Sequence, residues 1–274
     1  MTASLPLSPQ VFAILSALIE ERTGLHYDLQ ERALFAERVS GRATERGFET
    51  LLDYYYFLRY DAAADAELAL LAEALVVNET YFFREPAPLE ILVDEVVPGL
   101  LARGIKPRIW CAACSTGEEP LTLAMLLDEA GLLDQVSIVA SDISARVLAH
   151  AQAGLYRRRS LRALPPRVVG RWLEGHEHGM RVLPRIARAV AWRRINLIDE
   201  PEPSELESFH VIICRNVLIY FRDQTIESVV DRLWRQLSPE GYLLVGASES
   251  LLRFKVAFAC VEQRGAFFYR KQSK

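Results

Sequence analysis

The stretch Arg-Ile-Trp-Cys-Ala-Ala-Cys-Ser-Thr-Gly-Glu-Glu-Pro occupies residues 108–120 and decides the predicted fold. Its apolar first part predicts a buried strand, Ser-Thr-Gly predicts a tight turn, and the residues from Glu118 onward predict the start of a helix. A strand, a turn and a helix in this order begin many nucleotide-binding α/β domains, whose ligands lie beyond the carboxyl ends of the strands. We therefore expect a ligand against this turn, where Gly117 would allow close approach of the backbone.

The kind of ligand is indicated by the motifs that the turn lacks and by the two residues after its glycine. The sequence contains neither G-x-G-x-x-G nor G-x-x-x-x-G-K-[ST], so the usual cradles for a pyrophosphate and a triphosphate are missing. Glu118 and Glu119 come after the glycine instead, and carboxylates repel phosphate but attract an ammonium or sulfonium group. This combination favours S-adenosylmethionine, and it makes a nicotinamide-dependent dehydrogenase the least expected alternative.

Composition is that of an ordinary globular protein. The 274 residues are 51% hydrophobic with a net charge of −4, which suits one large domain or a catalytic domain with a small one. We expect a cytoplasmic protein without membrane insertion, because there is no signal-peptide pattern and no apolar run of ~18 residues. Cys111 and Cys114 form a C-x-x-C motif, but no second Cys or His pair completes a tetrahedral site, so we expect no metal.

The N-terminal part, residues 1–75, predicts a small helical domain. Ser8 and Pro9 are typical of a helix start and Gly24 of its end. Asp28 and Glu31 form a capping-box pattern for a second helix that runs to about residue 47. Amphipathic segments at residues 51–58 and 65–75 complete this part of the chain.

Four arginines of the second helix fall on one helical face, given ~100° of rotation per residue. They are Arg32, Arg38, Arg42 and Arg46. Such a face is either a solvated surface or a docking surface for an acidic partner, and the pattern leaves both open.

An irregular segment, Asn-Glu-Thr-Tyr-Phe-Phe-Arg-Glu-Pro, occupies residues 78–86. Aromatic residues between polar ones match neither a helical nor a strand period, so the segment is a linker or a wall of a binding site. We favour the wall. A helix over residues 89–102 then leads into the strand at Arg108.

The second predicted strand covers residues 136–141 and ends at Asp142. This aspartate lies 25 positions after Gly117 (142 − 117), close to the ~20 at which a carboxylate binds ribose hydroxyls. It is alternatively the N-cap of the next helix, over residues 145–153.

Residues 155–195 interrupt the α/β pattern. They contain eleven arginines and no lysine against Glu174 and Glu177, a local charge of +9 (11 − 2). Residues 179–183 and 189–195 predict strands of a small inserted sheet with a basic surface. Such a surface suits nucleic acid and acidic proteins alike.

The α/β pattern then resumes after Asn196 and Leu197. A buried strand over residues 209–214 ends at Arg215 and Asn216, where a parallel sheet binds its ligands. A helix over residues 225–237 and strands over residues 241–246 and 266–270 complete the predicted sheet.

Five of these motifs, in this order, resemble the chemotaxis receptor glutamate methyltransferases, the CheR family. They are Asn-Glu-Thr-Tyr-Phe-Phe-Arg at 78–84, Cys-Ser-Thr-Gly-Glu-Glu-Pro at 114–120, Ala-Ser-Asp-Ile at 140–143, Asn-Leu at 196–197 and Cys-Arg-Asn-Val-Leu-Ile-Tyr-Phe at 214–221. The resemblance implies a Rossmann-like class I methyltransferase sheet with helices on both faces. It also implies a helical N-terminal domain over residues 1–75, a methyltransferase domain over residues 76–274, and an inserted antiparallel β-subdomain over about residues 155–195.

The resemblance also implies the site residues. Glu119, with Glu118 as the alternative, would lie near the amino-acid end of S-adenosylmethionine, and Asp142 on its ribose. Arg84, which would also contact the cofactor, and Tyr220 would lie near the transferred methyl group. Without the family, the pattern favours Tyr220 as a core aromatic residue. The other residues implied to contact the cofactor are Asn78, Thr80, Asn196, Leu197, Arg215 and Asn216.

The implied acceptor is a glutamate on the cytoplasmic helices of a chemoreceptor, which the arginine-bearing second helix would contact. A carboxylate is already ionised at neutral pH, so its methylation needs no general base. The insert between Trp172 and Val182 is shorter than in family members that grip a receptor tether, so we expect a tether-independent enzyme. The alternatives are a nucleic-acid methyltransferase that uses the basic insert and a module that binds without turnover.

Overall fold

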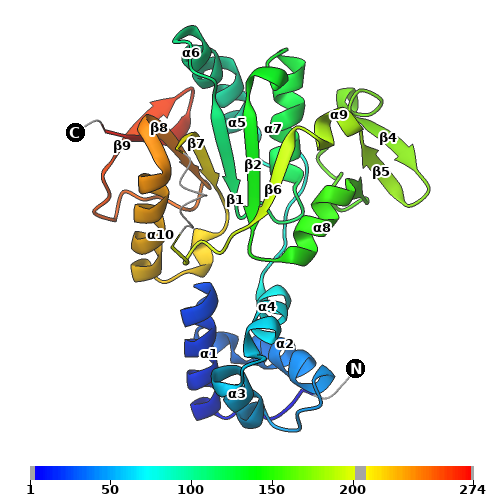
Figure 1. The fold of residues 1–274 in the computed structure, drawn as a ribbon, viewed down its shortest axis with the longest axis vertical. Coiled ribbons are helices and arrows are strands. Elements are labelled where there is room, and N and C mark those ends of the chain that lie inside the picture. The colour runs from blue at the N-terminus through cyan, green and yellow to red at the C-terminus, as the bar shows by residue number, and fades with distance from the viewer. Residues whose placement is uncertain (1–3, 201–207, 273–274) are drawn as a thin grey trace.

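The computed structural model describes residues 4–200 and 208–272. A helical unit lies below an α/β unit (Figure 1). Ser8 caps the first helix by accepting the N–H of Val11 at 3.2 Å, and Gly24 ends it at φ 78°, as predicted. The helices of this unit are α1 (Pro9–Thr23), α2 (Arg32–Glu45), α3 (Leu51–Tyr60) and α4 (Ala64–Leu75), with a short 3-10 turn η1 (Leu29–Glu31) before α2.

The α/β unit is built on a mixed sheet, seven-stranded within the described residues. Its spatial order is β6-β2-β1-β7-β8-β10-β9, and β10 runs antiparallel to both of its neighbours. The other pairings that involve β1, β2, β6, β7 and β8 are parallel. The strands are β1 (Arg108–Ala112), β2 (Ser137–Asp142), β6 (Val190–Arg194), β7 (Phe209–Cys214), β8 (Leu237–Val245), β9 (Phe258–Gln263) and β10 (Ala266–Lys271).

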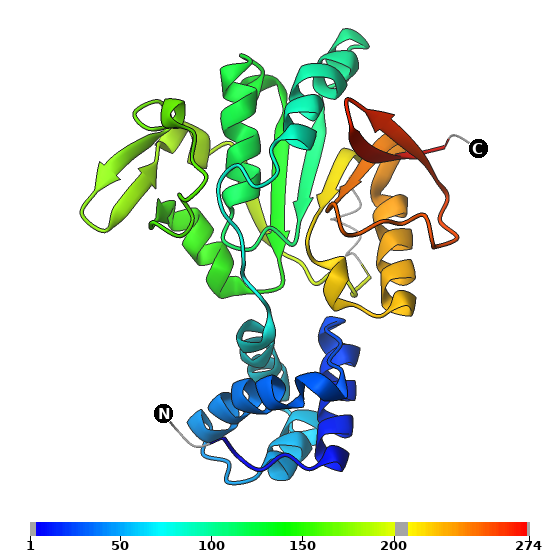
Figure 2. The same cartoon turned by 180° about the vertical axis from the view of Figure 1, so that it is seen from behind.

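Both faces of the sheet are covered by helices. Successive side chains of a strand point to opposite faces, so each strand contributes to two cores. Ile109 and Cys111 of β1 pack into one core, while Trp110 and Ala112 pack into the other. The first core is shared with α7 (Glu118–Glu129) and the second with α10 (Asp223–Gln236). The helices lie on either side of the sheet (Figure 2), which confirms the predicted fold class.

The helix predicted over residues 89–102 is a helical run with a wider turn inside it. It consists of α5 (Ala87–Ile91), a π-helical turn η2 (Leu92–Val96) and α6 (Val97–Ala102). The irregular turn precedes Pro98, which has no N–H to donate to the carbonyl of residue 94.

The inserted sheet contains only one of the two strands predicted for it. Its strands β3 (Leu155–Tyr156), β4 (Leu173–His176) and β5 (Gly179–Val182) pair antiparallel in the order β3-β5-β4. The second predicted strand, residues 189–195, is instead β6 of the main sheet and pairs parallel with β2. A short helix, α9 (Pro184–Ala187), returns the chain to the main sheet, so this part of the prediction is wrong.

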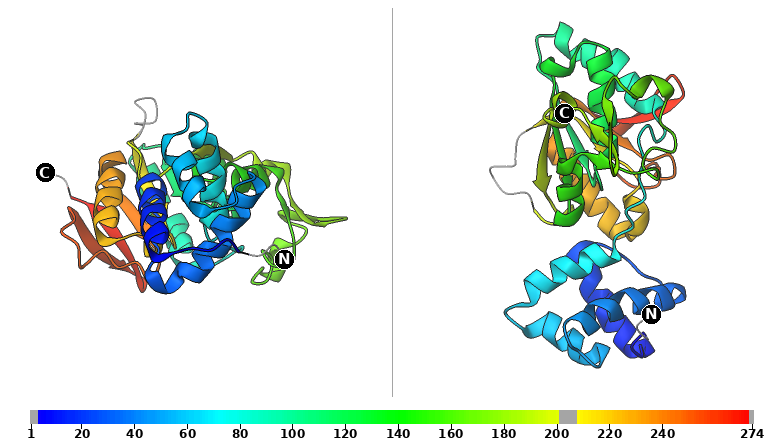
Figure 3. Two further views of the ribbon diagram at one scale, coloured as in Figure 1. Left: turned by 90° about the horizontal axis from the view of Figure 1, so that it is seen from below. Right: turned by 90° about the vertical axis from the view of Figure 1, so that its right-hand side faces the viewer.

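Segments far apart in the sequence join the two units. The N–H of His26 donates to the carbonyl of Tyr220 at 2.9 Å, and Asn196 Nδ2 donates to the carbonyl of Arg22 at 3.0 Å. Tyr220 and Phe221 pack against the core of the helical unit. Figure 3 shows the helical unit beneath the carboxyl ends of the strands. Within the described ranges, no helix combines the length and the apolar character needed to cross a membrane.

Candidate active site

A cavity opens at the carboxyl ends of β1, β2 and β7, between the two units. Its empty volume is about 950 Å³, with the open mouth included. Its lining includes all ten residues implied by the sequence: Asn78, Thr80, Arg84, Glu119, Asp142, Asn196, Leu197, Arg215, Asn216 and Tyr220.

The turn after β1 contributes backbone to the cavity, but not through its glycine. Ala113 and Ser115 line the cavity with φ of 54° and 50°, a left-handed conformation that costs energy for residues with a side chain. Gly117, at φ 91°, faces away: a Cβ there would lie 2.7 Å from Ala151 Cβ and 2.8 Å from the Trp192 ring. The expectation that Gly117 admits the ligand is therefore wrong, since packing between elements requires it.

Asp142 lies at the end of β2 and organises the turn beside it. Its Oδ2 accepts the N–H of Ser115 at 2.8 Å and its Oδ1 accepts the N–H of Ser144 at 3.0 Å. Burial raises the pKa of the Asp142 carboxyl above its ordinary value, although these backbone hydrogen bonds oppose the shift. Ser144, and not Asp142, is the N-cap of α8 (Ala145–Ala153), so the alternative interpretation of Asp142 as a helix cap is wrong.

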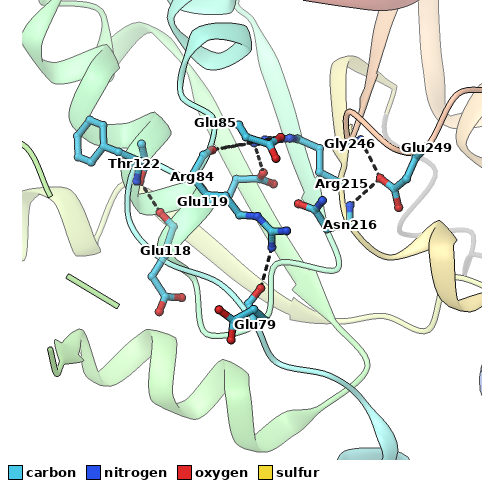
Figure 4. Close-up of polar contacts among 11 residues, drawn as sticks. Glu79, Arg84, Glu85, Glu118, Glu119, Thr122, Arg215, Asn216, Gly246 and Glu249 are labelled. Atoms are coloured by element: carbon cyan, nitrogen blue, oxygen red, sulfur yellow. Dashed lines mark hydrogen bonds and ion pairs between the residues drawn. The ribbon is translucent and has the colours of Figure 1, made fainter. Parts of the chain in front are cut away.

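Arg215 connects three segments of the cavity wall. Its side chain is 2% exposed, with Nη1 at 2.9 Å from Glu119 Oε2 and Nη2 at 2.7 Å from Glu85 Oε2 (Figure 4). Burial raises the pKa of Glu119, and the Arg215 charge opposes that shift. The guanidinium thus holds the end of β7, the start of α7 and segment 78–86 together.

Of the two adjacent glutamates, only Glu119 reaches the cavity. Glu118 is fully buried, and its Oε2 accepts the Thr116 hydroxyl at 2.7 Å. In Figure 4 its carboxylate points away from that of Glu119. Adjacent residues on a helix face directions about 100° apart, so only one of the pair can point at the ligand.

Segment 78–86 forms a wall of the cavity, as its irregular pattern predicted. Phe82 is fully buried, and the N–H of Phe83 donates to Thr122 Oγ1 at 3.1 Å. Arg84 Nη1 donates to the carbonyl of Glu79 at 2.8 Å, which folds the guanidinium back along the segment (Figure 4). Burial raises the pKa of Tyr220 and the positive charge of Arg84 opposes this, so the two side chains lie within electrostatic reach of each other.

Glu249 is a residue of the site that sequence reasoning missed. This carboxylate is 5% exposed and lies after β8 in the Gly-Ala-Ser-Glu stretch. Its two oxygens accept the backbone N–H groups of Asn216, Val217, Leu218 and Gly246 at 2.6, 2.8, 2.7 and 2.7 Å. A polar residue just beyond a strand's carboxyl end is the signal that identified Asp142, and it could have identified Glu249 too.

Three of the four arginines are engaged inside the helical unit. Arg46, directly after α2, lies 3.5 Å from Glu67 and over the ring of Phe57. Arg42 hydrogen-bonds both oxygens of Glu67, which is 3% exposed and also accepts the Tyr54 hydroxyl at 2.7 Å. Arg38 donates to the carbonyl of Leu75 at 2.5 Å. Burial raises the pKa of Tyr54, and its hydrogen bond to the glutamate adds to the shift. The arginine face is therefore partly structural, which neither of its predicted interpretations included.

The donor set of the cavity fits a cofactor that carries an ammonium, a carboxylate and ribose hydroxyls. Glu119 and Asp142 supply acceptors and Arg84 a cation, beside apolar residues such as Leu197 and Phe221. Cys111 lies in the core and Cys114 in the cavity wall. Among the residues that the structure describes, no group of three or more His, Cys, Asp or Glu could hold a metal ion.

Fold, cavity and donor set together define an S-adenosylmethionine-dependent methyltransferase. Two family models match the chain: "CheR methyltransferase, SAM binding domain" over residues 78–267 and "CheR methyltransferase, all-alpha domain" over residues 10–76. The chain belongs to the CheR family of chemotaxis protein methyltransferases, which confirms the resemblance. The junction between the two matches is close to the domain boundary predicted after residue 75.

Curated relatives match over nearly the whole chain. "Chemotaxis protein methyltransferase 2" of Vibrio cholerae is 34% identical, over 93% of this chain and 90% of that protein. A chemotaxis protein methyltransferase of Vibrio parahaemolyticus is 35% identical, over 98% and 99%. "Chemotaxis protein methyltransferase 1" of Pseudomonas aeruginosa is 31% identical, over 94% and 97%.

Proposed function

We propose that this protein transfers the methyl group of S-adenosylmethionine to glutamate side chains on the cytoplasmic helices of a chemoreceptor, forming methyl esters. The observation that carries the proposal is the convergence of Arg84 and Tyr220 on the same cavity as Glu119 and Asp142. A cation and a phenol at this cavity suit an acceptor that is itself an anion.

We also propose roles in cofactor binding for the other family-implied residues that line the cavity. Asp142 would bind the ribose hydroxyls, and Glu119 the ammonium group of the cofactor. The other cavity residues implied by the family would contact the adenine and methionine portions: Asn78, Thr80, Asn196, Leu197, Arg215 and Asn216. The side chains of Asn196 and Arg215 also hold the wall, through Arg22 and through Glu85 and Glu119.

The chemistry asks little of the protein beyond position. When bound, the cofactor supplies an electrophilic methyl group on a sulfonium. A glutamate carboxylate is ionised at neutral pH, so no residue of the chain has to remove a proton. Arg84 would contact the cofactor and also orient the acceptor carboxylate. The Tyr220 hydroxyl would donate a hydrogen bond to that carboxylate, and the apolar wall would exclude water.

The partner would be a receptor's acidic cytoplasmic helix, docked on the helical unit. Arg32 is the most available of the four arginines, because Arg38, Arg42 and Arg46 have partners inside the unit. The arginines with partners inside the unit would still add positive charge to the docking surface. We place the protein in the cytoplasm and expect activity on receptors without a C-terminal tether, which tight binding of an isolated receptor tail peptide would refute.

The test is transfer of labelled methyl from S-adenosylmethionine to a cytoplasmic receptor fragment, with mild alkali added afterwards. Release of the label as volatile methanol would establish a carboxyl methyl ester, and Arg84→Ala and Tyr220→Phe should each lower the rate. An unlabelled receptor, with intact cofactor binding, would contradict the acceptor. Label on nucleic acid would then favour a nucleic-acid methyltransferase that uses the basic insert. No transfer to either acceptor would favour a module that binds without turnover.

A further inference from the structure

Two arginines of the basic insert reach the wall of the cavity. Arg159 and Arg162 both bind the carboxylate of Glu79, a residue of segment 78–86: Arg162 Nη2 lies 2.6 Å from Oε1, and Arg159 pairs with Oε2. The hydrogen bond from Arg159, together with that from Arg162, lowers the pKa of Glu79. We call Glu79, Arg159 and Arg162 the brace.

The insert runs along the wall over several residues beyond the brace. The guanidinium of Arg162 lies over the ring of Tyr81, at 3.8 Å from its centroid. The N–H of Phe82 donates to the carbonyl of Ser160 at 2.9 Å, and its ring packs edge-on against Tyr156 at 4.7 Å. Contacts of three kinds therefore fix the path of residues 79–82 against the start of the insert.

The brace bears on the residue proposed to orient the acceptor. Arg84 Nη1 donates to the backbone carbonyl of Glu79 at 2.8 Å, so the orientation of that carbonyl determines where the guanidinium lies (Figure 4). The side chain held by Arg159 and Arg162 belongs to the same residue.

We propose that Arg159 and Arg162 are positioning residues for Arg84: by holding Glu79 they fix the carbonyl to which the Arg84 guanidinium is hydrogen-bonded, and with it the orientation of Arg84 in the cavity. This inference rests on the proposed role of Arg84. It gives part of the basic insert a task within the catalytic site, in addition to any contact with a partner.

The size of the effect is set by the exposure of the brace. Its side chains are 37–74% exposed, and ion pairs at such sites contribute little to folding. The brace therefore biases one local conformation without holding the fold together. A bias of this size corresponds to a change of roughly 1.5- to fivefold in an affinity that depends on Arg84.

The test is a double-mutant cycle on the full chain, with the dissociation constant of S-adenosylhomocysteine measured by calorimetry. Arg162→Ala should raise this constant by roughly 1.5- to fivefold. Arg84→Ala should raise it further, and adding Arg162→Ala to Arg84→Ala should change nothing more. Arg167→Ala is the matched control, because Arg167 is an exposed arginine of the same insert that pairs with Glu129 instead.

Two further measurements separate positioning from a general structural role. The thermal midpoint should stay that of the wild type in each variant. Because salt screens exposed ion pairs, rising ionic strength should weaken ligand binding more in the wild type than in the Arg159→Ala/Arg162→Ala variant.

Each contrary outcome points to a different failure. Independent, additive effects of Arg162→Ala and Arg84→Ala would overturn the positioning role while leaving the cofactor site intact. An unchanged affinity in Arg84→Ala would overturn the proposed contact of Arg84 with the cofactor, and the brace with it.

Discussion

Glu249 illustrates how a single buried side chain can set the geometry of a loop. The backbone from residue 216 to residue 218 lies outside the sheet, and its N–H groups donate to the Glu249 carboxylate instead of to a neighbouring strand. That loop begins with Asn216 at φ 60° and leads into the turn η6 (Leu218–Tyr220). Asparagine adopts this left-handed conformation more readily than most residues with a side chain, and the hydrogen bond from its N–H to Glu249 holds it there.

Glu249→Gln should therefore destabilise the protein and weaken ligand binding together. A glutamine has one accepting oxygen, so at least one buried N–H group would face an amide donor, which costs roughly 2 to 3 kcal/mol. Denaturant unfolding and the affinity for S-adenosylhomocysteine would measure both effects. Glu262→Gln, at an exposed position of β9, is the control and should match the wild type. Wild-type stability and affinity in the Glu249→Gln variant would show that the loop holds its shape without this carboxylate.

Asp142 provides a prediction about pH. Its raised pKa means that the carboxyl takes up a proton at a higher pH than an ordinary aspartate, whose value is 3.8. If the ionised form accepts the ribose hydroxyls, protonation opposes binding. Affinity for S-adenosylhomocysteine should thus fall as the pH is lowered through this raised pKa, and the fall should be smaller in Asp142→Asn, whose affinity is low throughout. Identical pH profiles in the two proteins would contradict the assignment.

Packing between elements explains the glycine in the turn between β1 and α7. Gly117 lies against Ala151 of α8 and Trp192 of β6, two residues that come more than thirty positions later in the chain. The caps and bounds of single helices were predictable, because they depend on neighbours in sequence: α8 covers residues 145–153 as predicted. The neighbour that Gly117 needs is not encoded in any local pattern.

Gly117→Ala should cost about 2 to 4 kcal/mol of unfolding free energy, through an unfavourable φ and a clash of Cβ with both neighbours. Gly131→Ala is the matched control: Gly131 has φ 71°, but a Cβ there would meet nothing within 4 Å. Gly131→Ala should lower the unfolding free energy by only about 1 kcal/mol, because it has the unfavourable φ but no clash. Equal costs for the two substitutions in denaturant unfolding would show that packing does not require Gly117.

In the assembled molecule, the helical unit combines two kinds of arginine on one helix. Arg42 neutralises the buried Glu67, whereas Arg32 is only partly buried. Periodicity alone grouped them, because it reports the direction of a side chain and not its partner. Substitution of Arg42 should therefore affect stability, whereas substitution of Arg32 should affect receptor binding.

Arg42→Ala should destabilise the helical unit by about 3 kcal/mol, since it removes the hydrogen bonds to both oxygens of the buried Glu67 carboxylate and leaves it only the longer ion pair with Arg46. Arg32→Glu should leave stability and cofactor affinity unchanged but raise the KM for a receptor fragment by roughly three- to tenfold, because it reverses a docking charge. Arg59→Glu, a charge reversal on α3, is the control for kinetics. A wild-type KM in Arg32→Glu would argue that α2 does not meet the receptor.

The sequence by itself determined the class of fold and the family resemblance, because strand ends, caps and motifs are local patterns. The ten predicted residues of the cavity then followed from the positions that match the family's motifs. Only the tertiary structure decided that residues 190–194 join the main sheet, that Glu119 and not Glu118 faces the cavity, and that Glu249 holds the loop after β7. An edge strand has the same alternation in either sheet. Partners such as Glu249 and Val217, 32 positions apart, meet only once the sheet has formed.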